Sequence, residues 1–254
     1  MRKVLFWDFD GTLVVSNPMW PEAMLRIIQS ETGRSDLTYH DIRPHTRIGF
    51  TWHTPDDDHT GYKGQLWWER MFVRFAEVLK IFGVPEDRAP IAARRMQEEI
   101  LRVSNYEIYE DTKDTLQYAI DRGWENYILS NNYPDMDLTM DALGLTPYFK
   151  DMVISARLGW DKPRAELFQY ALNLAGIRRV SQDPNAASAQ AARFVDAEGN
   201  EVQCFMVGDN PVADAFGASR VGLPCILVHK KTTVEDVVSA AYEFDSLTEL
   251  QSIL

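Results

Sequence analysis

Cysteine is scarce in this chain of 254 residues, which contains only Cys204 and Cys225, each in or beside a short apolar run. Two such cysteines indicate small buried side chains rather than a disulfide framework, so we expect a reducing, cytoplasmic environment. Long apolar runs are missing too, and none reaches the length of a membrane span. The run that follows Met1 is too short for a signal peptide and is interrupted by Asp8 and Asp10. We therefore expect a soluble protein with no membrane partner.

Positive charge is in deficit, because 26 lysines and arginines stand against 38 aspartates and glutamates, which gives a formal net charge of −12. Such a protein repels phosphate backbones and anionic membrane surfaces, so no nucleic-acid partner is expected. A small phosphorylated molecule can still bind in a pocket where a metal ion and a few cationic side chains make the local electrostatic potential positive. The chain is long enough to bury a substantial core in one or two domains. Nothing in the sequence predicts an oligomeric state.

Short apolar runs alternate with amphipathic helical patterns along most of the chain. These runs predict buried strands, and they cover residues 4–7, 127–129, 152–154, 204–207 and 225–228. Strands separated by helices predict an α/β fold with a doubly wound parallel sheet.

Residues 16–106 interrupt this alternation. Apolar residues three and four apart, as from Trp68 to Phe82, predict helices there, and no run predicts a strand. We therefore expect a core made of residues 1–15 and 107–254, with residues 16–106 inserted as an all-helical cap domain. An insertion directly after the first strand is placed to act as a lid over that strand's end.

Some segments have a less regular pattern. Prolines and glycines in residues 36–63 predict mostly loop. Within residues 181–203, the later part resembles a β-hairpin with its turn at Glu198-Gly199-Asn200, and nothing in the sequence assigns this insertion a role. The adjacent Trp67 and Trp68 are expected to divide between the core and the lid surface.

The first predicted strand ends in two acids, Asp8 and Asp10, followed by Gly11. Ligands in open α/β sheets bind beyond the carboxyl ends of strands. Side chains two residues apart on a strand point to the same side, and two such carboxylates repel each other unless a cation lies between them. The arrangement favours a hard metal ion such as Mg²⁺. The alternative is an ordinary strand-to-turn junction, because Asp-Gly is common in turns.

Three further polar clusters follow predicted core strands. Ser130 and Asn131 offer a hydroxyl and an amide to a phosphoryl oxygen, and Lys162 offers a compact cation. Asp209 and Asp214 place one acid at a strand end and one at the start of a helix. Each cluster alone also fits a structural role, as a helix cap, a solvated lysine or a turn. Four clusters after four strands, all suited to one task, favour a shared site.

Together these clusters resemble the four motifs of the haloacid dehalogenase (HAD) superfamily. The matching residues, in the family's order and at typical separations, are Asp8-Phe9-Asp10-Gly11-Thr12-Leu13-Val14, Ser130-Asn131, Lys162-Pro163 and Gly208-Asp209-Asn210-Pro211-Val212-Ala213-Asp214. The helical insertion is similar to the C1-type cap of the phosphoglycolate-phosphatase-like branch. The resemblance implies a Rossmann-like core and a Mg²⁺-dependent phosphatase, which is a phosphoric monoester hydrolase, acting on a small phosphate ester.

The resemblance also implies a role for each matched residue. Asp8 is the nucleophile that forms an aspartyl-phosphate, and Asp10 protonates the leaving oxygen and then activates water. Mg²⁺ is held by Asp8, by the backbone carbonyl of Asp10 and by Asp209, while Asp214 orients Lys162 or a metal-bound water. The residues that hold the phosphoryl group are Ser130, Asn131 and Lys162.

Asp10 favours phosphoryl transfer over dehalogenation, because true dehalogenases need neither Mg²⁺ nor an acid at this position. Mutases with the same type of cap carry an acid and a histidine early in the cap, where this chain has Val15 and Trp20. A phosphatase is therefore preferred, and a phosphomutase or other phosphotransferase is the nearest alternative. A non-catalytic binding protein on the same scaffold is a second alternative, which the retention of all motif residues disfavours.

Substrate choice is expected to depend on the cap. Its irregular part gathers several side chains able to contact an anionic or ring-bearing leaving group: His45, Arg47, Trp52, His53, His59 and Lys63. The alternative is that these are solvated loop residues around one packed tryptophan. Among them, Arg47 is our candidate for a specificity residue.

Overall fold

The computed structural model describes residues 1–181, 192–229 and 240–254. Its main element is a sheet of six parallel strands, in the spatial order β3 (Asp151–Ile154), β2 (Trp124–Ser130), β1 (Arg2–Trp7), β6 (Val202–Gly208), β7 (Cys225–Val228) and β8 (Tyr242–Phe244). The predicted parallel sheet is confirmed, and the edge strand β8 is an addition to it. Trp7, the last residue of β1, lies beside Ile128 of β2 and Val207 of β6, so β2 and β6 extend only slightly past the end of β1.

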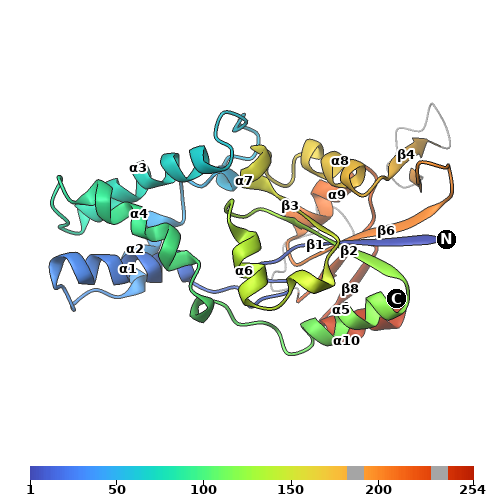
Figure 1. The fold of residues 1–254 in the computed structure, drawn as a ribbon, viewed down its shortest axis with the longest axis horizontal. Helices are drawn as coiled ribbons and strands as arrows, with labels where there is room; N and C mark the ends of the chain where they lie inside the picture. Colours follow the sequence, from blue (N-terminus) through green and yellow to red (C-terminus); the bar gives the residue numbers. More distant parts are fainter. Residues whose placement is uncertain (182–191, 230–239) are drawn as a thin grey trace.

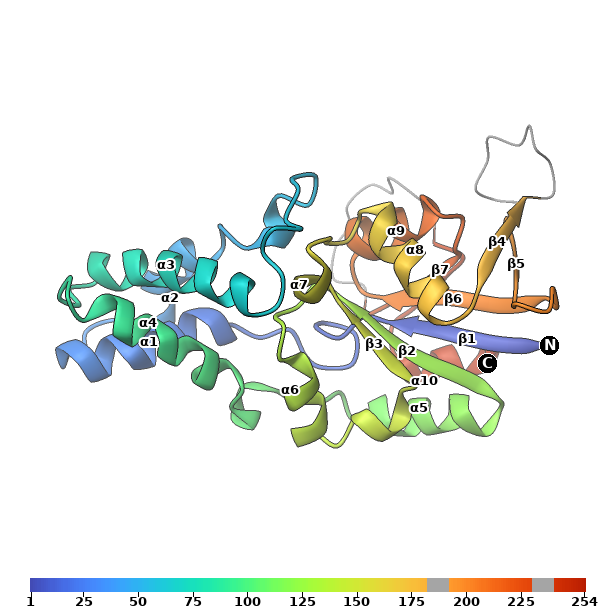
Figure 2. The same cartoon turned by 45° about the horizontal axis from the view of Figure 1, so that its top comes forward.

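Helices cover both faces of this sheet, as expected for a doubly wound fold. On one face lie α5 (Thr112–Asp121) and α10 (Leu247–Leu250), and on the other α8 (Ala165–Leu174) and α9 (Gly217–Ser219) (Figure 2). Successive side chains of β1 alternate between the two layers. Leu5 and Trp7 pack with the α5 and α10 layer, whereas Val4 and Phe6 pack with the α8 and α9 layer. None of these four side chains is exposed, which explains the uninterrupted apolar run at the start of the chain.

Shorter elements complete the core. They are α6 (Met136–Ala142), α7 (Ser155–Leu158), the single-turn segments η3 (Thr146–Tyr148) and η6 (Gln251–Ile253), and the π-helical η5 (Pro211–Phe216). The helix predicted to begin near Val212 is thus a π-helical turn that runs into α9. Among the described residues, no helix has both the length and the apolar character needed to cross a bilayer.

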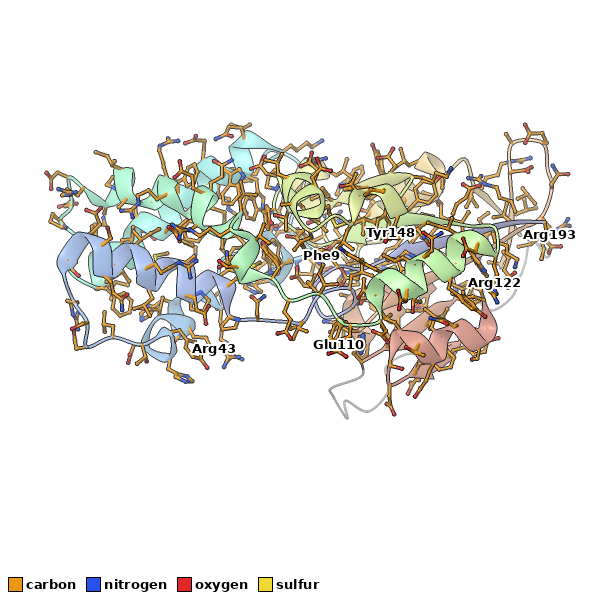
Figure 3. The ribbon with its side chains drawn as sticks, turned by 60° about the horizontal axis from the view of Figure 1, so that its bottom comes forward. Phe9, Arg43, Glu110, Arg122, Tyr148 and Arg193 are labelled. Atoms are coloured by element: carbon orange, nitrogen blue, oxygen red, sulfur yellow. The ribbon has the colours of Figure 1, made fainter. Side chains whose placement is uncertain are left out.

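The inserted residues 16–106 lie at one end of the molecule, and both chain termini lie in the sheet-containing part (Figure 1). This insertion, which we call the cap segment, contains helices and no strand: α1 (Met19–Thr32), α2 (Tyr39–Thr46), α3 (Gln65–Ile81), α4 (Ala89–Ile100) and the single turns η1 (Thr51–His53) and η2 (Val103–Asn105). In Figure 3, Phe9 lies where the cap segment meets the core, and Arg193 lies at the far end of the core.

The expectation of mostly loop over residues 36–63 missed the helix α2. A capping box starts this helix, because the backbone N–H of Thr38 donates to Asp41 (2.8 Å) and the Thr38 side chain also contacts that carboxylate. Pro44 lies inside the helix, although a proline at this position of the sequence predicts a break in a helix. The local cap therefore outweighs the proline, which the sequence pattern alone did not reveal.

Trp67 and Trp68 are both fully buried, so the expectation that they divide between core and surface is wrong. Each indole N–H has a partner, since Trp67 Nε1 donates to Thr51 Oγ1 (3.3 Å) and Trp68 Nε1 donates to Asp135 Oδ2 (2.7 Å). A buried tryptophan is tolerated once its N–H is hydrogen-bonded. Asp135 immediately precedes α6, so Trp68 also connects the cap segment to the core.

The predicted hairpin pairs differently from the expectation. The turn is present, because the N–H of Asp196 donates to the carbonyl of Asn200 (2.9 Å). However, the strand before it, β5 (Ala192–Val195), pairs antiparallel with β4 (Arg178–Ser181) and joins the strand after the turn by only a single bridge, Val195 to Glu201. The Ala- and Ser-rich part of the predicted insertion lies outside the described residues.

A second connection between the cap segment and the core involves residues 51–64. The N–H of Gly64 donates to the carbonyl of Ala156 (2.9 Å), and Arg164 Nη1 donates to the carbonyl of Asp57 (3.0 Å). Gly159 approaches the cap backbone so closely that a Cβ there would lie 2.5 Å from the carbonyl oxygen of His59. This connection ends at the loop that carries Lys162, so the cap segment and the core loop hold each other in place.

Candidate active site

The topology brings the four sequence motifs to one edge of the sheet. β1 lies between β2 and β6, so Ser130 at the end of β2 and Asp209 just beyond β6 lie on either side of Asp8. Lys162 lies in the loop that follows α7, next to the β3 side of the sheet. This is the edge where open α/β sheets bind ligands, and the predicted convergence of the strand ends is observed.

Two donors share one oxygen of Asp8. Ser130 Oγ donates to Asp8 Oδ1 (2.8 Å), and Lys162 Nζ lies 2.9 Å from the same oxygen. Neither of these two contacts involves Oδ2. Asp8 is therefore fixed in orientation through one oxygen, and its second oxygen is the one available to a ligand.

Lys162 is buried between two carboxylates. Its Nζ lies 2.6 Å from Asp214 Oδ1 in addition to the contact with Asp8, and only 2% of the residue is exposed. Burial alone would lower the pKa of Lys162, but the negative charges of Asp214 and Asp8 outweigh it, so the pKa lies above its usual value. The ammonium stays charged and supplies a fixed cation to a site that is otherwise acidic.

Asn131 positions the backbone of this lysine. Its side-chain Nδ2 donates to the carbonyl of Lys162 (3.0 Å), and its Oδ1 accepts from the N–H of Lys162 (2.7 Å). Both functions of the amide are therefore used on the loop. The structure gives Asn131 a positioning contact and also places it in the wall of the pocket described below.

Asp214 is held by both of its oxygens. Oδ1 contacts Lys162, and Oδ2 accepts from the N–H of Asn210 (3.0 Å). The Asn210 side chain in turn caps η5 by accepting from the N–H groups of Val212 and Ala213. A Cβ at Gly208 would lie 2.1 Å from Asp214 Oδ2, so only glycine permits this approach. Asp214 is thus the buried counterion of Lys162.

Asp10 and Asp209 have perturbed acidities. Burial, followed by the charge of Asp8, raises the pKa of Asp10 from 3.8 to about 7, although Asn132 Nδ2 donates to Asp10 Oδ2 (2.8 Å) and partly offsets the shift. Burial and the same neighbouring charge raise the pKa of Asp209 to about 7. Both carboxyls therefore exchange protons near neutral pH, which suits an acid-base group and also shows that the acidic cluster repels itself.

The acidic cluster fits a divalent cation. One carboxylate oxygen from each of Asp8, Asp209 and Asp214 lies within 4.8 Å of the others, and hard oxygen donors suit small divalent metals. Lys162 already neutralises Asp214, so Asp8 and Asp209 are the side chains better placed to bind a metal ion. Gly11 leaves room beside them, because a Cβ at that position would lie 2.3 Å from Asp209 Oδ2.

A pocket of about 440 Å³ opens above these side chains. The core contributes the motif residues Asp8, Asp10, Asn131, Lys162, Asp209 and Asn210 together with Pro163, Val212 and Ala213. The cap segment contributes Ser16, Trp52, His53 and Pro55. Ser130, which is 1% exposed, lies behind Asp8 and is not among the residues that line this pocket.

The cap residues selected from the sequence separate in space. Trp52 and His53 line the pocket, whereas His59 is buried and hydrogen-bonds to Arg70 and to the carbonyl of Thr54. Arg47 is exposed and lines a neighbouring pocket of about 350 Å³, which contains none of the motif acids. Its role in substrate choice stays a prediction.

Two contributors were not selected from the sequence. Asn132 bonds to the acid-base candidate Asp10, and Asn210 organises Asp214 and η5. Both directly follow residues that were selected, and position in the motif is the only signal that the sequence offers for them. Their roles depend on side-chain directions at strand ends, which the apolar pattern does not encode.

The comparison with known proteins agrees with this geometry. A family model described as haloacid dehalogenase-like hydrolase matches residues 2–222. This chain belongs to that family of hydrolases. The chain is 30% identical over 150 residues to a phosphoserine phosphatase from Thermus thermophilus, covering 58% of this chain and 51% of that protein. It is 26% identical over 180 residues to haloacid dehalogenase-like hydrolase domain-containing protein 3 from Homo sapiens, covering 70% of this chain and 61% of that protein.

Solved structures of HAD-type hydrolases share the fold across the whole chain. YfnB from Bacillus subtilis, in a crystal form bound to magnesium, superposes with a TM-score of 0.66 at 20% identity and covers 100% of this chain and 98% of its own. A 2-haloacid dehalogenase from Pseudomonas syringae superposes with a TM-score of 0.64 at 20% identity over the same shares. Phosphatase-like and dehalogenase relatives therefore share this scaffold, and the residues of the site must distinguish the two chemistries.

Proposed function

We propose that this HAD hydrolase is a Mg²⁺-dependent phosphatase that hydrolyses a small phosphate monoester through an aspartyl-phosphate on Asp8. Asp10 is the observation that carries the proposal. An alkoxide leaving group needs a proton, whereas a halide leaving carbon needs none. A carboxyl with a pKa of about 7, held by Asn132 in the same pocket as Asp8, is suited to supply that proton.

The first half of the reaction uses Asp8 as the nucleophile. Its Oδ1 is held by Ser130 and Lys162, so Oδ2 is the oxygen that attacks phosphorus, and the bond from phosphorus to the ester oxygen breaks. Asp10 gives its proton to the departing oxygen, which leaves as an alcohol. Lys162 neutralises charge on the transferring phosphoryl group at no cost of reorganisation, because it is already charged and fixed.

The second half returns the enzyme to its starting state. Asp10, now ionised, accepts a proton from a water molecule that attacks the phosphorus of the aspartyl-phosphate, and inorganic phosphate leaves. Asp8 and Asp209, with the backbone carbonyl of Asp10, would hold the Mg²⁺. When bound, the ion offsets the repulsion between the carboxylates and the phosphate oxygens. We also propose that residues 16–106 act as the cap that closes over this pocket.

Turnover of para-nitrophenyl phosphate tests the proposal. We expect hydrolysis with Mg²⁺, loss of activity with EDTA, and a loss of at least about a thousandfold in Asp8→Asn, because the nucleophile is removed. Asp141→Asn, an exposed carboxylate on α6, is the matched control and should keep full activity. Full activity of Asp8→Asn, or release of halide from a 2-haloacid without any phosphatase activity, would contradict the proposal. Transfer to an added hexose in preference to water would instead establish a phosphotransferase.

A further inference from the structure

The walls of the catalytic pocket differ in charge from its floor. The floor holds Lys162 and three acids that the proposed reaction uses. Of the described residues that line the remainder, none carries a fixed charge: Ser16, Trp52, His53, Pro55, Asn131, Pro163, Asn210, Val212 and Ala213. A carboxylate or ammonium group on the alcohol part of a substrate would find no counterion among these wall residues.

Trp52 is a fixed aromatic wall. Its ring stacks on Phe50 (centroids 4.6 Å apart, planes 9° apart) and on Trp67 (5.8 Å, 23°). The centroids of Phe50 and Trp67 are only 6.3 Å apart, so Trp52 does not lie between them and both pack on one side of it. The other side of this half-buried ring faces the pocket, already ordered before a ligand binds.

His53 provides a neutral polar group beside this wall. It packs edge-on against Phe50 (5.6 Å, 79°), and desolvation together with the charge of Arg74 lowers the pKa of His53. The lowered pKa favours the neutral imidazole, which can donate or accept one hydrogen bond. It can bind a hydroxyl group or a ring heteroatom without requiring a charge on the ligand.

We propose that the substrate is the phosphate monoester of an uncharged, ring-bearing alcohol, whose ring packs on Trp52 and whose polar group hydrogen-bonds to His53. This inference rests on the proposed phosphatase function. A pocket of 440 Å³ accommodates a phosphoryl group and one or two rings. Esters whose alcohol carries a carboxylate, an amine or both, as in phosphoserine, are disfavoured because neither group has a counterion.

Three esters of matched size test the charge requirement, with ethyl phosphate as the ringless reference. They are benzyl, para-carboxybenzyl and para-aminomethylbenzyl phosphate. We expect kcat/KM for benzyl phosphate to exceed that of both charged analogues and of ethyl phosphate by about tenfold or more. A hexose phosphate, measured in parallel, shows whether the preferred ring is aromatic or a sugar. Equal or better turnover of either charged analogue overturns the inference while the phosphatase proposal stands, and absence of turnover with every ester overturns both.

Variants test the role assigned to Trp52. Trp52→Ala should raise KM for benzyl phosphate about tenfold with little change in kcat, should raise KM for ethyl phosphate by a much smaller factor, and should be rescued by Trp52→Phe. Trp20→Ala is the matched control, because Trp20 belongs to the same aromatic cluster (4.6 Å from Phe50) but does not line the catalytic pocket. An equal loss of ring preference in Trp20→Ala would assign the effect to packing of the cap segment and overturn the role of Trp52.

Discussion

Asp8 and Asp10 are two residues apart on the same strand end, yet different neighbours suit them to different tasks. Asp8 faces the hydroxyl of Ser130 and the ammonium of Lys162. Asp10 faces a neutral amide and the charge of Asp8, so its pKa rises to about 7. Two carboxyls whose surroundings differ in this way can divide the roles of nucleophile and acid.

The proposed role of Asp10 as the proton donor predicts that activity depends on the leaving group. Asp10→Asn should reduce kcat about a hundredfold or more for an alkyl phosphate, whose alkoxide requires protonation. The loss should be much smaller for the first half-reaction with para-nitrophenyl phosphate, whose phenolate leaves without a proton. Single-turnover kinetics with both esters measure this difference. An equal reduction for the two esters would remove Asp10 from the protonation step.

The acidity of Asp209 predicts how the stability of the metal-free protein changes with pH. The fold raises the pKa of this carboxyl from 3.8 to about 7, so the folded protein keeps a proton that the unfolded chain has released. The stability that the protonated carboxyl contributes is full below about pH 4 and is lost as pH rises through about 7. Asp209→Asn mimics the protonated form and avoids this loss. In EDTA, its advantage over wild type should grow by about 1–2 kcal/mol between about pH 5 and pH 8.

Urea unfolding of both proteins at the two pH values gives this difference. Added Mg²⁺ should reduce the stability advantage of Asp209→Asn. We expect the ion to bind through Asp209 and so to stabilise the wild type more than the variant. An advantage of Asp209→Asn that is the same at both pH values would show that the fold does not hold this proton.

At the scale of elements, the connection between residues 51–64 and the loop before Lys162 determines how the cap segment meets this lysine. Gly159 approaches the backbone of His59 and Thr60 closely in this connection, and its φ of +76° lies in the left-handed region. The apolar pattern predicted β1, β2, β3, β6, β7 and most helices correctly, because it reflects burial. It missed α2 and the burial of both tryptophans, because a capping box and two indole hydrogen bonds are local contacts outside that periodicity.

Gly159→Ala should lower the free energy of unfolding by more than backbone strain alone accounts for, because the added Cβ also clashes with the cap segment. Gly33 is the matched control, since it also ends a helix in the left-handed region (φ +72°) but has no atom within 4 Å of an added Cβ. Gly33→Ala should cost about 1 kcal/mol of unfolding free energy. Gly159→Ala should cost about 1–3 kcal/mol more and should lower kcat/KM, because the clash with His59 displaces the cap segment. Equal costs and unchanged activity in the two variants would show that this contact does not matter.

At the scale of the whole molecule, a chain with a net charge of −12 concentrates a buried lysine and several acids at one edge of its sheet. The sequence predicted this edge, because the four motifs follow successive strands. The family resemblance implied that Asp214 orients Lys162 or a metal-bound water, but nothing in the sequence predicted that Ser130 lies behind Asp8 or that Asp8 shares Lys162 with Asp214. Those contacts depend on long-range packing of strand ends, which no single stretch of sequence contains.

Covalent phosphorylation of Asp8 is the decisive test of the proposed phosphatase mechanism. The protein is mixed with Mg²⁺ and an aryl phosphate, quenched in acid within the first turnover, and digested for mass spectrometry. We expect one added phosphoryl group on the peptide containing Asp8, localised to that residue and absent from Asp8→Asn. Hydrolysis of the ester with no phosphorylation of Asp8, together with activity retained in Asp8→Asn, would contradict it.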